Sequence, residues 1–168
     1  RTVSFFEPRN IHLGSHVRID GYTVISAAKG LHIGNYVHIA CFCQIVGAGG
    51  PVVFEDFAGL SARVSVYTST DDYTGGSLTN PTVPDRYKQL RSGPVTLKRH
   101  VIVGCGSVLM PGVTLETGAS VGALTFVNKS VPSNSVVAGH PMRVVGQRNG
   151  ERLLALEAEL REAESLAR

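Results

Sequence analysis

Apolar residues return at every sixth position over the second half of the chain. The series runs Leu97, Val103, Leu109, Leu115, Val121 and Val127. A second series of small or apolar residues lies four positions after the first: Val101, Ser107, Val113, Ala119 and Thr125. Neither the helical period of about 3.6 residues nor simple strand alternation gives this step, which is typical of a parallel β-helix whose hexads each form one flat side of a coil. One side cannot bury its own inward residues, so stacked coils must supply a continuous core.

The same step is present upstream, with two interruptions. It holds over residues 13–25, resumes over 33–45 after a slip at 27–30, and returns over 54–66 after a Gly-rich break at 47–50. Its members are Leu13, Ile19, Ile25, Ile33, Ile39, Ile45, Phe54, Leu60 and Val66. A β-sandwich of short strands is the ordinary alternative, but its strands do not hold one fixed step across a whole domain. We therefore predict an all-β domain, a parallel β-helix, over residues 1–148.

The six-residue step is absent from residues 69–94. This stretch reads STDDYTGGSLTNPTVPDRYKQLRSGP, which is polar and holds three prolines and three glycines. A loop of this length inside a compact domain is usually functional. We expect it to protrude from the coils as an insertion in the domain.

Residues 149–168 change to helical spacing. The apolar positions of one face are Leu153, Leu156, Leu160, Ala163 and Ala167. Asn149 and Gly150 are suited to begin this helix. We expect the helix to pack against the coil stack or a sister subunit, since the length is marginal for the coiled coil that has the same spacing.

Composition narrows the class of protein. The chain has 168 residues, of which 43% are hydrophobic, enough for one domain with a sizeable core. Its three cysteines fit neither a disulfide framework nor a zinc site, so we expect no metal, a reducing compartment and a cytoplasmic location. No apolar run is long enough to cross a bilayer. A net charge of +3 is too weak for a nucleic-acid footprint.

The second half of the chain resembles a known family. The runs VGALTFVNKSVP and VVAGHPMRVV are similar to the end of sugar O-acetyltransferases of the maltose, galactoside and Nod-factor type, which are hexapeptide-repeat transferases with a left-handed β-helix. The similarity covers roughly residues 13–148. It implies a left-handed coil, a homotrimer with active sites between neighbouring subunits, and acetyl-CoA as the acyl donor.

The resemblance assigns donor-binding roles to two corners of the coil. Cys105 and Ala123 match small residues beside the pantetheine arm of the family's donor. Gly104 and Gly122 precede them and would permit the close approach of an extended ligand. Plain corner geometry is the alternative explanation for these glycines.

Three further residues match the nucleotide end of the family's donor site. Asn128 and Lys129 match its Thr-Lys pair, and Arg143 matches the arginine after its return loop. Lys129 and Arg143 would donate charge-assisted hydrogen bonds to the CoA phosphates. Solvated surface charge is the alternative for both.

The catalytic base departs from the family pattern. In the sugar acetyltransferases a histidine stands at the start of the protruding loop, and here Asp71 occupies that position. An aspartate of ordinary pKa is a poor base towards an alcohol. We predict that His38, at an outward coil position, acts as the base while Asp71 fixes its tautomer. His100, just after the loop, is the second candidate.

The acceptor site also departs from the family. Ala40 and Ala48 stand where the galactoside and maltose enzymes place an Asn and an Asp against the sugar. The loop should therefore set specificity, and we expect Asp72, Tyr73 and Arg86 to bind the acceptor. A structural flap against the neighbouring subunit is the alternative for part of this loop.

Four functions come into question for a protein with this fold. The first is an acetyl-CoA-dependent O-acetyltransferase acting on a sugar or glycan hydroxyl, as in surface-polysaccharide pathways. The second is an N-acetyltransferase of a nucleotide-linked amino sugar, because a neutral amine needs less help from a base. A γ-type carbonic anhydrase shares the coil but needs three convergent His ligands, for which no matching set is present. A non-catalytic trimeric scaffold would fail to bind CoA.

Overall fold

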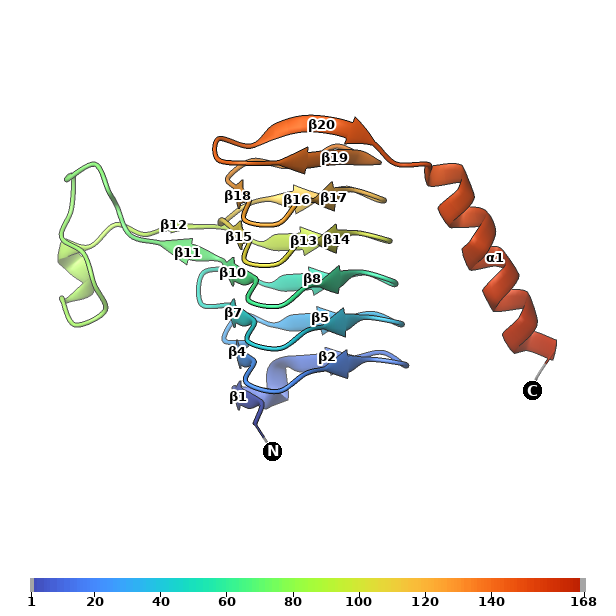
Figure 1. Ribbon diagram of the computed structural model, residues 1–168. Coiled ribbons are helices and arrows are strands. Elements are labelled where there is room, and N and C mark those ends of the chain that lie inside the picture. Colours follow the sequence, from blue (N-terminus) through green and yellow to red (C-terminus); the bar gives the residue numbers. More distant parts are fainter. Residues whose placement is uncertain (1, 167–168) are drawn as a thin grey trace.

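The computed structural model describes residues 2–166, which wind into a three-sided prism of about seven coils with a C-terminal helix beside it (Figure 1). A complete coil contributes one short strand to each of three mostly parallel sheets, which we call sheets A, B and C. The chain runs from sheet B to C to A in every coil, so the prism has B–C, C–A and A–B corners. The predicted left-handed β-helix is confirmed.

The strands of sheet A are β1 (Ser4–Phe6), β4 (Val24–Ser26), β7 (Gln44–Val46), β10 (Ser65–Tyr67), β15 (Val108–Leu109) and β18 (Phe126–Val127). Sheet B consists of β2 (Ile11–Leu13), β5 (Leu31–Ile33), β8 (Val52–Phe54), β13 (Val95–Leu97) and β16 (Thr114–Leu115). Sheet C consists of β3 (Arg18–Ile19), β6 (His38–Ile39), β9 (Gly59–Leu60), β14 (Ile102–Val103), β17 (Ser120–Val121), β19 (Ser135–Ala138) and β20 (Arg143–Gln147). Within these three sheets, β20 is the one described strand that is antiparallel to its neighbour, because the chain turns back across the end of the stack after β19.

The six-residue series forms the core of the prism. Leu97, Val103, Leu109, Leu115, Val121 and Val127 are each at most 2% exposed. They stack in register from coil to coil, as where Leu97 lies opposite Leu115. Leu13 is exposed and Ile19 only half-buried, because both belong to the first strands of their sheets, where no coil beneath covers the side chains.

Aromatic rings and histidines stack along the B–C corner. His16, Tyr36, Phe57 and His100 all have φ between 56 and 61°, the left-handed conformation that turns the chain sharply at this corner. Their ring centroids are 4.5, 4.9 and 5.0 Å apart in order along the stack. Stacked pairs of this kind add stability beyond the area they bury.

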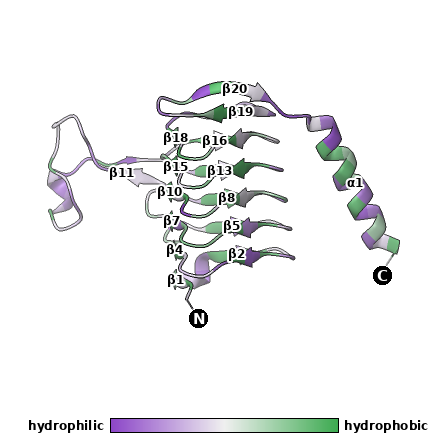
Figure 2. Cartoon of the chain, in the orientation of Figure 1, coloured by the Kyte–Doolittle hydropathy of each residue, from purple (hydrophilic) through white to green (hydrophobic). Residues whose placement is uncertain are grey.

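The predicted loop leaves the prism at the A–B corner and projects away from it as an arm (Figure 1). Its root is a short antiparallel pair, β11 (Ser69–Thr70) with β12 (Arg91–Ser92), and its outer part contains the 3-10 helix η2 (Asp85–Tyr87). A second 3-10 helix, η1 (Pro8–Asn10), joins β1 to β2. Figure 2 shows that the arm is mostly hydrophilic, in contrast to the strands of the prism.

The C-terminal helix α1 (Gly150–Leu166) stands beside the B–C corner, on the side of the prism opposite the arm (Figure 1). It begins as predicted, with the Asn149 Oδ1 atom accepting a hydrogen bond from the Arg152 amide at 2.9 Å. The predicted apolar face is not buried on this chain's own coils, since Leu156 and Leu160 are exposed. Ala167 lies outside the described residues.

The one buried residue of α1 is Glu157, because Arg99 and His100 of the corner approach its carboxylate at 3.2 and 2.7 Å. Among residues 2–166, no helix combines the length and the apolar character that crossing a membrane requires.

Candidate functional site

The outward face of sheet A is hollowed beneath the root of the arm. Two adjoining hollows of about 600 and 610 Å³ share Thr70, Asp71, Tyr73 and Met110 in their walls. The second is floored by outward-pointing residues of three successive strands of sheet A: Tyr67, Val108 and Phe126. Because the arm overhangs an apolar floor, this cleft offers space for a ligand with both polar and apolar parts.

Asp71 lies in the walls of both hollows, directly after β11. The antiparallel pairing of Thr70 with Arg91 fixes the backbone just before it. Its Oδ1 atom accepts a hydrogen bond of 3.3 Å from the Asn80 amide, which leaves most of the carboxylate's acceptor capacity available to a ligand. Asp71 is therefore placed to meet a ligand in the cleft.

The other arm residues of the predicted acceptor site separate into two groups. Asp72 and Tyr73 line the cleft. Asp72 also shapes the arm, because the Thr74 hydroxyl and amide donate to its Oδ1 atom at 2.6 and 2.8 Å and hold the pKa of its carboxyl below the usual value. Arg86 lies farther out in η2, with its guanidinium 4.7 Å from the ring centroid of Tyr87, and does not line this cleft.

The predicted pantetheine residues lie at the C–A corner, where the strands that floor the cleft begin. Cys105 precedes β15 and is exposed, and Ala123 occupies the same position one coil further, before β18. The structure accounts for Gly104 by packing alone, since a Cβ there would lie 2.5 Å from the Ala123 amide nitrogen. In Gly122 a Cβ would lie 3.0 Å from the Ala138 Cβ. Packing against the next coil therefore accounts for Gly104, whereas at Gly122 a Cβ would make only a tight contact.

The predicted phosphate-binding residues lie at the other end of the cleft floor and on the returning strand. Asn128 and Lys129 follow β18 at the A–B corner and are exposed. Within the described part of the chain, the Lys129 ammonium has no ion-pair partner. Arg143 begins β20 and donates one hydrogen bond, to the neighbouring Met142 carbonyl at 3.2 Å. Both cations are thus available to an anion.

His38 lies on sheet C, on another side of the prism, and is held by a residue that the sequence analysis did not consider. Its Nε2 atom is 2.8 Å from the Asp20 Oδ2 atom. Arg18 donates to the other oxygen of Asp20 at 2.7 Å. The hydrogen bonds from His38 and Arg18 hold the pKa of the Asp20 carboxyl below its usual range. The predicted pairing of His38 with Asp71 is therefore not formed within one chain.

The length of one coil is the signal that could have identified Asp20 as a neighbour of His38. One coil takes about twenty residues, so outward positions 18 to 20 apart lie on adjacent coils, as Arg18 lies opposite His38. The same rule identifies the cleft floor, which consists of outward positions on successive strands. His100, the second candidate base, is hydrogen-bonded to the C-terminal helix, with its Nε2 atom 2.7 Å from the Glu157 Oε2 atom.

The histidines do not converge as a metal site requires. The His12 and His32 rings stack on the outward face of sheet B, 4.5 Å apart, and both line a separate hollow on that sheet. Over residues 2–166, no three His, Cys, Asp or Glu side chains are grouped so as to hold a metal ion.

Comparisons with known proteins agree on the class of molecule. The chain is 41% identical over 156 residues to a dTDP-4-amino-4,6-dideoxy-D-glucose acyltransferase of Escherichia coli, covering 92% of this chain and 80% of the relative. It is 38% identical over 61 residues, 36% of this chain and 30% of the relative, to the galactoside O-acetyltransferase of Escherichia coli strain K12. No family model matches the chain.

Solved structures give the same result. AntD, an N-acyltransferase from Bacillus cereus in complex with dTDP and 3-hydroxybutyryl-CoA, superimposes with a TM-score of 0.94 at 34% sequence identity, covering 98% of this chain and 86% of AntD. A structure of a point mutant of AntD contains dTDP-4-amino-4,6-dideoxyglucose and coenzyme A. It matches with a TM-score of 0.91 at 34% identity, covering 97% of this chain and 86% of AntD.

Proposed function

Because this chain belongs to the hexapeptide-repeat acyltransferases of sugars, we propose that it transfers an acyl group from a CoA thioester to the amine of a nucleotide-linked amino sugar. The observation that carries the proposal is the similarity to a dTDP-amino-sugar acyltransferase over nearly the whole chain. Of the two acceptors predicted from the sequence, the amine of an amino sugar is therefore better supported than the sugar hydroxyl that was given first.

The chemistry of the cleft supports an amine acceptor. A hydroxyl needs a base of substantial strength as it attacks a thioester, whereas an attacking amine becomes cationic and gives up its proton to a weaker base. The cleft presents the carboxylate of Asp71 at the root of the arm. We infer that Asp71 holds the amine by a charge-assisted hydrogen bond and receives its proton.

The residues around the cleft fit a CoA thioester, which supplies an activated acyl carbonyl. Met110 and Phe126 offer an apolar surface to the pantetheine. The small side chains of Cys105 and Ala123 leave the C–A corner open beside it. The Lys129 and Arg143 cations are suited to the phosphates at the nucleotide end.

The assembly and location follow as parts of the proposal. We propose a homotrimer with its sites between neighbouring protomers, because the arm projects away from its own prism and its sequence is mostly polar. The proposed reaction takes place in the cytoplasm, where CoA thioesters and nucleotide sugars are formed.

The test is release of the CoA thiol from acetyl-CoA or 3-hydroxybutyryl-CoA in the presence of dTDP-4-amino-4,6-dideoxyglucose. We expect turnover with the amine and at least tenfold less with the corresponding 4-hydroxy sugar nucleotide. Asp71→Asn should lower kcat about 100-fold, a usual loss for a general base. Asp85→Asn, at the exposed end of the arm, is the matched control and should leave kcat unchanged. Absence of amine-dependent thiol release, or equal turnover of the hydroxyl analogue, would overturn the proposal.

A further inference from the structure

The outward face of sheet C has a gap in its row of side chains. The row rises through Arg18, His38, Gly59 and Ile102 on successive coils, each lying opposite the next in parallel register. His38 and Ile102 are both exposed. Between them, the glycine leaves the backbone of the sheet uncovered.

Nothing in the packing of the prism requires glycine at this position. A Cβ on Gly59 would meet a single atom of the described residues within 4 Å, the His38 carbonyl oxygen at the ordinary contact distance of 3.5 Å. The backbone of Gly59 is not in the left-handed region either. Gly104 differs, because its Cβ would collide with the next coil. A glycine within a strand that neither sterics nor backbone angles demand often marks close approach of a ligand.

The histidine beside the gap is held in one orientation. Because the His38 Nε2 atom is bonded to the Asp20 carboxylate, the neutral ring has its proton on Nε2, and Nδ1 remains as an acceptor. Asp20 is itself fixed by Arg18 at 2.7 Å. This side of the gap therefore offers an oriented acceptor for a hydroxyl group, and Ile102 offers an apolar surface on the other side.

We propose that this gap, formed by His38, Gly59 and Ile102, binds the hexose ring of the acceptor. The ring lies flat over Gly59, one of its hydroxyls donates to His38 Nδ1, and its C–H groups contact Ile102. Asp20 is a positioning residue that acts through His38. The inference rests on the proposed function and names the residues that recognise the sugar.

The geometry of the prism places the gap and the cleft on different molecules. Sheet C and the hollowed face of sheet A are two sides of one convex prism, so a single hexose cannot face both within one protomer. The arm that reaches a given gap is therefore that of a second copy of the chain. Each complete site joins Asp71 of one protomer to the gap of its neighbour.

Steady-state kinetics on the whole chain tests the subsite. Gly59→Val fills the gap, and Gly59→Ala fills it partly with a Cβ at ordinary contact distance, so that this second variant keeps the fold. We expect KM for the sugar nucleotide to rise at least tenfold in G59V and several-fold in G59A, while KM for acyl-CoA and the melting temperature stay at parent values. Asp20→Asn should raise the same KM and leave kcat within about twofold. Thr96→Val, on the outward face of sheet B, is the control.

Each result decides between definite alternatives. Parent values of the sugar-nucleotide KM in both Gly59 variants would overturn the subsite while the proposed function stands. Equal increases in KM for the sugar nucleotide and for acyl-CoA would also overturn it, because they would indicate a general distortion of the prism. An inactive parent enzyme would overturn the proposed function and this inference with it.

Discussion

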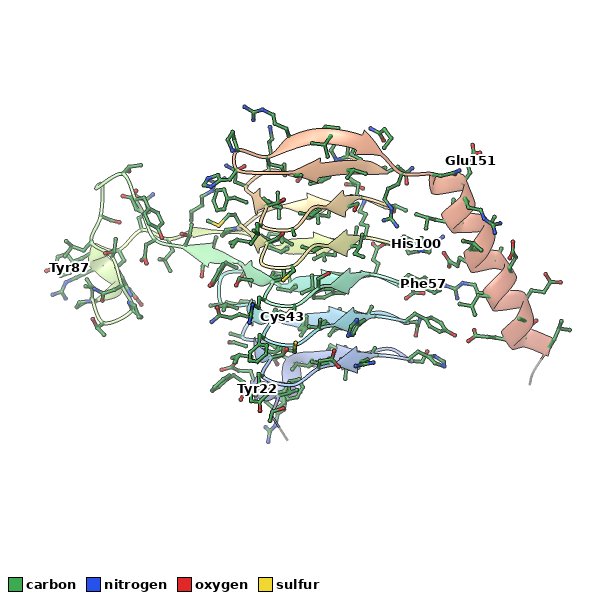
Figure 3. The ribbon with its side chains drawn as sticks, viewed as in Figure 1. Tyr22, Cys43, Phe57, Tyr87, His100 and Glu151 are labelled. Carbon is green, nitrogen blue, oxygen red and sulfur yellow. The ribbon has the colours of Figure 1, made fainter. Side chains whose placement is uncertain are left out.

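The Nε2 atom of His100 lies 2.7 Å from the Oε2 atom of Glu157, and this pair joins the C-terminal helix to the B–C corner of the prism. Figure 3 shows His100 and Phe57 pointing from the coils toward the helix. Arg99 and Arg161 approach the same carboxylate at 3.2 and 2.7 Å, and Arg161 lies over the Phe57 ring, 5.6 Å from its centroid. The Glu157 carboxylate is thus shared by three cationic side chains, and Arg161 also pairs with Asp56 at 3.0 Å.

Removing this carboxylate should release the helix. Glu157→Ala leaves His100 and two arginines without their shared acceptor, which costs about 2 kcal/mol of docking free energy. Amide hydrogen exchange over residues 150–166 should accelerate about 30-fold, with little change in the coils. Glu159→Ala in the same helix, where the carboxylate is exposed, is the control and should exchange at the parent rate. Unchanged protection in E157A would show that the helix is held by other contacts.

The docking of the helix should fail in acid. Burial alone raises the pKa of Glu157, but the hydrogen bonds from Arg161 and His100 outweigh it and hold the pKa below its ordinary value. The pKa of Asp56 is also lowered, because the bonds from Asn35 and Arg161 outweigh its desolvation by burial.

A lowered carboxyl pKa stabilises docking above the unfolded-state pKa, about 4.5 for a glutamate, and this contribution is lost as the pH falls through the lower, folded-state value. Limited proteolysis should cut near residue 150 progressively faster below about pH 4.5. The E157A variant should show a weaker dependence on pH over the same range. A cleavage rate independent of pH would contradict the assignment.

The reactivity of the Cys105 thiol tests where the acyl donor binds. Cys105 is exposed at the C–A corner, whereas Cys43 is buried and burial raises the pKa of its thiol. Iodoacetamide should therefore modify Cys105 first. Saturating CoA should slow this modification at least tenfold, as followed by mass spectrometry of the intact protein and its peptides. Dephospho-CoA tests the phosphate contacts and should protect less well at equal concentration. Full reactivity of Cys105 in the presence of bound CoA would exclude the proposed pantetheine path.

Two variants with low kcat/KM should restore each other. If each site takes Asp71 from one protomer and His38 from its neighbour, mixed trimers of Asp71→Asn and His38→Ala contain sites in which both residues are intact. When equal amounts of the two variants reassemble at random, about half of the sites receive an intact Asp71, and about half of these also receive an intact His38. About a quarter of the parent kcat/KM should therefore be recovered. The assay uses the sugar nucleotide well below the parent KM. Activity no higher than the mean of the two variants would place both residues in one protomer.

The prism could be predicted from the sequence because the six-residue pattern that specifies it is local and repeated. Residues six apart such as Leu97 and Val103 must both point inward, whatever the rest of the chain does. The helix was also foreseeable from its spacing, but its buried residue was not. Glu157 is buried only because His100 and Arg99 stand opposite, and that pairing joins segments 57 residues apart.

The candidate site was predictable in part. Asp71 was found because the family resemblance aligns it with the histidine at the start of the family's protruding loop. The partner of His38 was missed because Asp20 lies on a different coil, and only the coil length brings the two together. The open position at Gly59 needed coordinates, because its sequence does not distinguish it from glycines that packing demands.

The arm emerges from the prism without disturbing it. Val66, just before the arm, lies opposite Ile45 on one side and Leu109 on the other, so the coils on either side of the insertion stay in step. A segment attached in this way can be lengthened, shortened or exchanged at the cost of loop closure alone. Grafting arms of other lengths or sequences is therefore a direct engineering route, in which the wall of the cleft can be rebuilt while the coils, with the gap on sheet C, are inherited intact.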